Sequence, residues 1–201
     1  MRKAILMLIL GLLSSMLCLP GAHGQARNQK SRMPVYQDHD GYEVLSVLLN
    51  RLSVAWKNET IRIGPQTSSG KGVAGIKAQC VGIPAEFQAA SQDFDKKAQT
   101  RFLLRRGFSL RKKYELGYAS PRIAADQPRS KEEDRKRIRS GTYYLAAVGF
   151  DEKRTRAVAF VEYICGSLCG DSLFYYLRKS EKGWEEDREV PRKIQSCGQI
   201  Y

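Results

Sequence analysis

The fold is decided by the stretch TRAVAFVEYICGSLCGDSLFYYLRK, residues 155–179. Two runs rich in β-branched and aromatic residues, 155–165 and 171–179, flank a short Gly-containing link, and this pattern is typical of an antiparallel hairpin. Another such run precedes the hairpin at 143–150, and a weaker, charged run follows a turn at 184–190. We therefore predict a C-terminal β-meander whose last strand lies at a sheet edge.

Upstream of the hairpin, two segments have the apolar periodicity of amphipathic helices, at 41–56 and 84–102. Asp40, with Glu43 three residues later, matches an N-terminal capping box for the first helix. Pro84 suits the first position of the second helix. Short strands are predicted at 59–63 and near 108–116. The predicted fold class is α+β, with two amphipathic helices packed on a mainly antiparallel sheet that ends in the β-meander.

The N-terminal residues have the order of a secretory signal. A basic pair at 2–3 precedes an apolar run over 4–19, and a Pro-Gly pair and small residues follow up to Gly24. This order predicts export to the periplasm or the medium after cleavage near Gly24. A membrane anchor is the main alternative, but the run falls short of the roughly 20 apolar residues that span a bilayer. A lipoprotein is a third alternative because Cys18 ends the run, although Leu17 stands where lipidation normally takes a small residue.

Export sets the domain organisation that we expect. The signal peptide spans 1–24, a flexible leader 25–37 and a single α+β domain 38–201, with a charged loop near 119–141. No second apolar stretch of the sequence approaches the length of a membrane span, so we predict no transmembrane segment in the mature chain.

The chain is strongly basic. Its formal net charge is +13, or +11 once Arg2 and Lys3 are removed with the signal peptide. Such a charge attracts phosphates, acidic polysaccharides or lipid headgroups, so the predicted partner is an anionic surface or polymer. The plainer alternative is that the excess charge only aids solubility, because the basic residues are spread along the chain and often neighbour acids.

The best candidate for an anion-binding surface follows the second predicted helix. The basic residues that interleave there with aromatic ones are Arg105, Arg106, Arg111, Lys112 and Lys113. Single-stranded nucleic-acid platforms combine cations and aromatics in this way, but we do not expect nucleic acid to be the partner. The alternative is a half-buried strand with its aromatic side chains inward and its arginines outward.

Four cysteines remain after signal cleavage, and in an exported chain they predict disulfides. They are Cys80, Cys165, Cys169 and Cys197. Of the three pairings we favour Cys165–Cys169 with Cys80–Cys197, because the ends of a three-residue hairpin loop can approach to the roughly 4.4–6.8 Å between Cα atoms that a disulfide needs. A redox pair would have C-x-x-C at a helix N-terminus, and a zinc site would have paired spacing of all four cysteines.

Catalytic chemistry has few residues to draw on. His39 is the single histidine of the mature chain and no G-x-S-x-G motif accompanies it, so we do not expect a Ser-His-Asp triad. Asp38, His39 and Asp40 lie together, but the residues that follow do not fit a calcium-binding loop. We therefore predict no catalytic residue, no cofactor and no metal site.

One acid interrupts an apolar strand. Strand alternation places Glu162 on the face of Val158, Phe160 and Ile164. A glutamate on a buried face has a raised pKa and can serve as a general acid or base. The alternatives are that this face is solvated, or that Arg178 on the next strand pairs with the carboxylate.

The C-terminal region also resembles a known pattern. It has a VGF block at 148–150, a C-G-x-L-C-G hairpin at 165–170 and a K-x-G-W-like turn at 182–184. In this order the chain resembles a group of exported bacterial proteins. The resemblance implies an exported α+β domain and a structural role for the C-G-x-L-C-G hairpin, and it implies no activity.

These observations lead to three functional hypotheses. The first is a non-enzymatic binding or envelope-associated domain with a basic surface. The second is a carboxylate-dependent hydrolase that acts in the cell envelope with Glu162. The third is a polyanion or nucleic-acid binder that uses the basic residues after the second helix. No oligomeric state is predicted.

Overall fold

The structure is a computed structural model that describes residues 33–69, 82–118, 131–132, 139–166 and 169–191. These residues belong to one compact unit that begins at Met33. The predicted signal peptide, Cys80, Cys197 and most of the charged loop near 119–141 lie outside the described residues. None of the helices within those ranges is long and apolar enough to cross a membrane.

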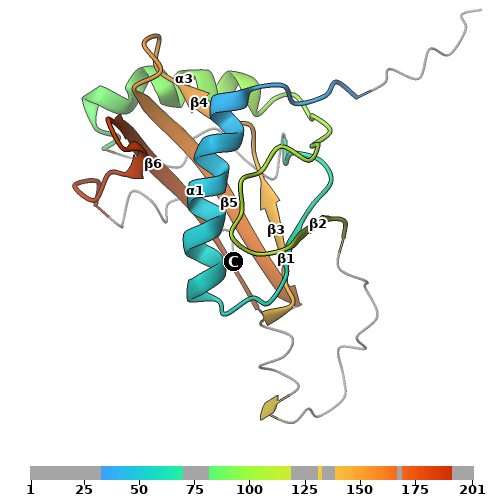
Figure 1. Cartoon of the computed structure of the whole chain (residues 1–201). Coiled ribbons are helices and arrows are strands. Elements are labelled where there is room, and N and C mark those ends of the chain that lie inside the picture. The colour runs from blue at the N-terminus through green and yellow to red at the C-terminus, as the bar shows by residue number, and fades with distance from the viewer. Residues whose placement is uncertain (1–32, 70–81, 119–130, 133–138, 167–168, 192–201) are drawn as a thin grey trace, which may run out of the picture. The chain divides into compact units, whose positions relative to one another are not determined.

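Within these described ranges the chain forms two α-helices, a short 3-10 helix and seven strands (Figure 1). The helical elements are α1 (His39–Ala55), η2 (Ala85–Phe87) and α3 (Gln88–Lys97). The strands are β1 (Ile61–Ile63), β2 (Tyr114–Leu116), β3 (Thr142–Leu145), β4 (Gly149–Phe150), β5 (Arg156–Gly166), β6 (Cys169–Ser180) and β7 (Gly183–Glu186). This arrangement confirms the α+β class with two helices on a sheet.

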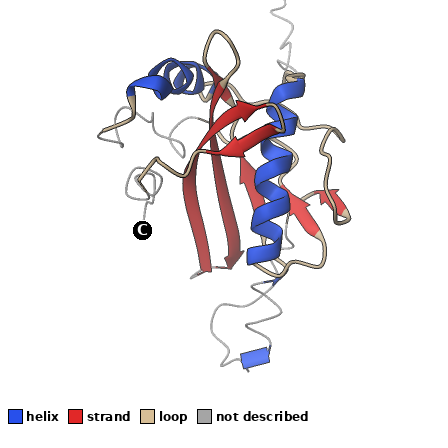
Figure 2. Cartoon of the chain, turned by 60° about the vertical axis from the view of Figure 1, so that its left-hand side comes forward, coloured by secondary structure: helices blue, strands red, loops and turns tan. Residues whose placement is uncertain are grey.

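The sheet is mixed, and not mainly antiparallel as predicted. Its order is β2-β1-β3-β5-β6-β7, with β4 paired to β5 beside that path. β1 runs parallel to both β2 and β3, whereas the pairs formed by β5 with β3, β4 and β6, and by β6 with β7, are antiparallel. β5 and β6 are the longest strands, and Figure 2 shows them as the two long strands of the sheet.

The predicted four-strand meander is not confirmed, because its first strand divides into β3 and β4. Both pieces pair with β5, but the residues between them turn toward other partners. Ala146 bridges to Ser68, and the Val148 N–H donates to the Tyr36 hydroxyl at 3.1 Å. Tyr36 is itself buried, so the folded domain begins a few residues before the predicted boundary at Asp38.

The two faces of the sheet carry separate cores. Alternate residues of β5 face opposite ways, as in any strand. One face, with Ala157, Ala159 and Val161, packs against Leu45, Leu48 and Leu49 of α1. The other face, with Val158, Phe160, Phe174 and Tyr176, packs against Phe87, Ala90 and Phe94 of η2 and α3. The helices therefore cover opposite faces of the sheet, and Figure 1 shows α1 lying over β5.

The second helix ends earlier than its apolar periodicity predicts. α3 stops at Lys97, whereas the prediction extended to residue 102. The reason is a competing set of hydrogen bonds. Phe102 donates its N–H to the Thr67 hydroxyl at 2.9 Å and accepts from the Thr67 N–H at 2.8 Å. These bonds draw the chain out of the helix and into an extended course.

Candidate functional site

The extended course begins a cationic stretch, residues 101–113, which we call the basic segment. It contains six cations and no acid: Arg101, Arg105, Arg106, Arg111, Lys112 and Lys113. β2 begins at Tyr114, directly after the basic segment, so the strand predicted near 108–116 is confirmed over three residues alone.

The beginning of the basic segment lies between two other stretches of chain. The Leu103 N–H donates to the Pro34 carbonyl at 2.8 Å, and the Leu103 carbonyl accepts from the Tyr36 N–H at 2.9 Å. On the other side, the Leu104 N–H donates to the Pro65 carbonyl at 2.9 Å. The backbone here is therefore fixed by hydrogen bonds to segments that lie far away in the sequence.

Farther along, the basic segment runs beside α1 and bonds to a polar stripe on that helix. The stripe consists of Tyr42, Ser46 and Asn50, which recur every four residues and so share one side of α1. Their oxygen atoms accept backbone N–H bonds from Arg105 at 2.9 Å, Ser109 at 2.9 Å and Arg111 at 2.8 Å. Asn50 also donates to the Ser109 carbonyl at 3.0 Å. We call this set of bonds the α1 ladder.

Aromatic packing adds to the α1 ladder. Phe108 is buried, and its ring makes edge contacts with Tyr42 and Tyr114 at centroid distances of 4.9 and 5.6 Å. Leu104 is also buried. Leu104 and Phe108 thus point into the protein and anchor the segment from within.

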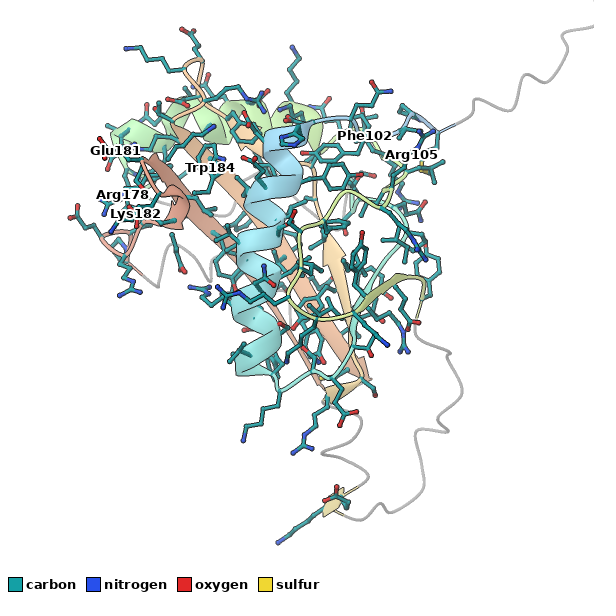
Figure 3. The ribbon with its side chains drawn as sticks, in the orientation of Figure 1. Phe102, Arg105, Arg178, Glu181, Lys182 and Trp184 are labelled. Atoms are coloured by element: carbon teal, nitrogen blue, oxygen red, sulfur yellow. The ribbon has the colours of Figure 1, made fainter. Side chains whose placement is uncertain are left out.

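Four of the five predicted anion-binding residues are exposed, namely Arg105, Arg106, Arg111 and Lys113. Within the described ranges, no carboxylate lies within ion-pairing distance of these four side chains. Several cations elsewhere are paired: Arg51 with Glu186, Arg62 with Glu115, and Arg178 with Glu185. Figure 3 shows Arg105 on one side of α1, and Arg178 and Lys182 on the other.

Lys112, the fifth predicted residue, has a different role. Its ammonium group donates to the carbonyls of Ser53 and Asn58, just where α1 ends. A cation at this position satisfies carbonyls that have no partner within the helix and interacts favourably with the helix dipole. Lys112 therefore stabilises the α1 C-terminus.

Arg101 was not among the predicted anion-binding residues. It is exposed at the start of the basic segment and donates a hydrogen bond to Ser69.

The acidic residues before α1 form a structural cluster. The N-cap is Asp38, which accepts from the Gly41 N–H at 3.2 Å, so the predicted capping box of Asp40 and Glu43 is wrong. Asp40 instead accepts from Arg154 at 2.5 Å, and this hydrogen bond holds the pKa of Asp40 below its usual range. The side-chain ligand atoms of His39, Asp40 and Glu43 lie within 4.8 Å of one another. Arg154 already binds the Asp40 carboxylate. We therefore interpret the cluster as a structural feature that fixes the turn before α1, and not as a cation site.

Glu162 lies on the face that alternation predicts, beyond the part covered by α3. Its neighbours across the sheet are Tyr144 on β3 and Ser172 on β6, and neither is a carboxylate. Arg178, the predicted partner, pairs with Glu185 at 3.3 Å. Burial raises the pKa of Glu162, as expected for an acid that loses water without gaining a cation. The paired carboxyls on which glycosidases depend are therefore not formed by Glu162 and its described cross-strand neighbours.

Replacing Glu162 by glutamine is expected to stabilise the protein at neutral pH. An acid with a raised folded-state pKa supports folding fully below its unfolded pKa, and that support is lost as the pH rises through the folded pKa. Urea unfolding of Glu162→Gln and wild type should give equal free energies at about pH 4 and a more stable variant at about pH 7.5. The exposed Glu59→Gln is the control, with no such divergence. Parallel pH profiles for Glu162→Gln and wild type would show that burial of the carboxylate has no energetic effect.

The cysteines can be placed only in part. Cys165 is buried on β5, and Cys169 begins β6, where it pairs in register with Gly166. The backbone therefore brings these two positions together across the hairpin. The disulfide pairings remain predictions.

No protein family model, no curated protein and no solved structure matches the chain.

Proposed function

We propose that this protein is an exported, non-enzymatic binding domain that takes an anionic partner on the basic segment. One observation carries the proposal, namely a group of exposed cations with which no described acid pairs: Arg105, Arg106, Arg111 and Lys113. The backbone that carries them is held by the α1 ladder. A fixed backbone lowers the entropy lost on binding, because the cations are already arranged before the partner arrives. The signal-like order of the N-terminal residues supports export, and an envelope association would suit such a surface.

The anion-binding proposal is tested by salt-dependent binding to heparin. The mature chain should bind heparin at about 0.1 M salt and release it steeply as salt rises, since each neutralised anion displaces counterions. A variant with all four exposed cations changed to glutamine should bind at least about tenfold more weakly.

The matched control removes the same charge from other exposed positions. It changes Lys96, Lys153, Lys182 and Arg188 to glutamine. Because the net charge of the two variants is identical, a difference between them reports the arrangement of charge and not its sum. The proposal fails if both variants lose the same affinity, or if neither loses any.

A further inference from the structure

The basic segment and the helix beside it also present apolar side chains to water. Five large apolar residues are exposed in the described ranges. One of them lies in the segment, Leu103 at 42%, and two lie on α1, Val47 at 38% and Val54 at 65%. Of the other two, Tyr118 follows β2 and stacks on Tyr144, and Ile164 lies on β5. Single exposed apolar residues are normal on a protein surface. Here they lie near exposed cations with no described acidic partner, so we consider whether both kinds of side chain contact the same partner.

Leu103 lies within the basic segment. Its N–H and carbonyl bond to residues 34–36, and it also bridges to Gln66, so its backbone is held on both sides. Exposure alternates along the chain here, since Arg101, Leu103 and Arg105 are exposed while Phe102 is half-buried and Leu104 is buried. Alternate residues of an extended chain point to the same side. Leu103 therefore projects outward between two arginines and cannot turn inward without breaking these bonds.

The two valines lie on α1 next to the other end of the segment. Asn50, which holds the Arg111 backbone, is three residues from Val47 and four residues from Val54. Residues at these spacings are neighbours on a helix surface. The Arg111 backbone is thus held at a residue of α1 whose neighbours on the helix surface include both valines.

We propose that the basic segment docks on the surface of an anionic lipid bilayer, with its cations on the headgroups and Leu103 and Val54 in the interfacial layer. This inference rests on the proposed anion binding and names its partner. A soluble polyanion would need only the cations, whereas binding at a lipid surface depends on apolar contact together with electrostatic attraction. The same band of surface offers both, and its backbone is fixed in place by the α1 ladder.

The experiment measures flotation of the mature chain with lipid vesicles. One set contains about 30% phosphatidylglycerol in phosphatidylcholine, and the other contains phosphatidylcholine alone. The variants are Leu103→Asn and, as a matched control, Ile164→Asn, because the two side chains are similarly exposed at 42% and 38%. Each variant is also tested on heparin, which offers anions without an apolar layer.

The wild type should bind the anionic vesicles and not the neutral ones. Leu103→Asn should weaken vesicle binding about fivefold and leave heparin binding unchanged, because the lost contribution is apolar burial. Ile164→Asn should change neither. If the wild type binds heparin but not vesicles, or if Leu103→Asn binds vesicles like wild type, the lipid partner is wrong and anion binding stands. Failure to bind either heparin or vesicles would overturn both proposals.

Discussion

Replacing Gly149 by alanine is expected to lower the free energy of unfolding by about 3 kcal/mol, the upper range for overpacking a tight core. Gly149 opens β4 where α3 crosses it. A Cβ at this position would lie 2.3 Å from both the Ala90 carbonyl oxygen and the Phe94 amide nitrogen. Both atoms belong to the backbone of α3, so the clash cannot be relieved by a side-chain rotation. The whole helix must shift away from the face formed by Phe160 and Phe174.

The Gly149→Ala effect is measured by urea unfolding followed by tryptophan fluorescence. Gly117→Ala is the matched control, because a Cβ there would meet nothing within 4 Å. We expect the control to unfold within about 0.5 kcal/mol of wild type. Equal stabilities for Gly149→Ala and wild type would mean that α3 is held less closely to β4 than the structure indicates.

Replacing Asn58 by alanine is expected to lower the free energy of unfolding by about 3–4 kcal/mol. Asn58 is buried beneath the end of α1 and connects three parts of the chain. Its amide nitrogen donates to the Arg139 carbonyl and to the Tyr163 hydroxyl, each at 2.7 Å. Its amide oxygen accepts from the Tyr143 hydroxyl at 2.6 Å. Alanine would remove all three hydrogen bonds. The Tyr143 hydroxyl would lose its partner in a buried site, which is costly, whereas the Tyr163 hydroxyl would still accept from the Gly141 N–H at 3.0 Å.

Smaller changes separate the parts of the Asn58 network. Tyr143→Phe removes one hydrogen bond and should lower the unfolding free energy by about 1–2 kcal/mol, clearly less than Asn58→Ala. Gln92→Ala, an exposed amide on α3, serves as the control and should have little effect. If Asn58→Ala were no worse than Tyr143→Phe, the amide could not be the centre of the network.

Local sequence patterns predicted those elements whose side chains repeat regularly. The apolar spacing over 41–56 is confirmed by α1, and the two runs around residue 167 are confirmed by β5 and β6. A long amphipathic segment has many residues that follow the same apolar period, so one residue that breaks the period does not change the predicted element.

The mixed character of the sheet could not be predicted in the same way. β1 and β2 have three residues each and pair in parallel across a long connection. A three-residue strand has no period to recognise, and nothing local determines the direction of its partner. The N-cap prediction failed for a related reason, because Arg154, more than a hundred residues away, binds both Asp38 and Asp40, and no local pattern shows that Asp38 is the residue that caps the helix.

For the candidate site, sequence charge alone identified the basic segment but not its arrangement. In the sequence Lys112 is equivalent to its basic neighbours. In the structure its ammonium group reaches the end of α1, whereas the side chains of the other predicted residues are exposed. One signal was available: Tyr42, Ser46 and Asn50 repeat every four residues on a helix whose other side is apolar. Such a polar stripe can mark a second chain segment lying on the helix, and here it does.

The α1 ladder holds the basic segment by its main-chain N–H groups, which every residue except proline possesses. Substitutions at the outward positions of the segment would therefore leave its attachment intact. Such a loop can acquire, lose or reverse its charges with little penalty to folding, so related chains could retain this scaffold while their preferred partners diverge.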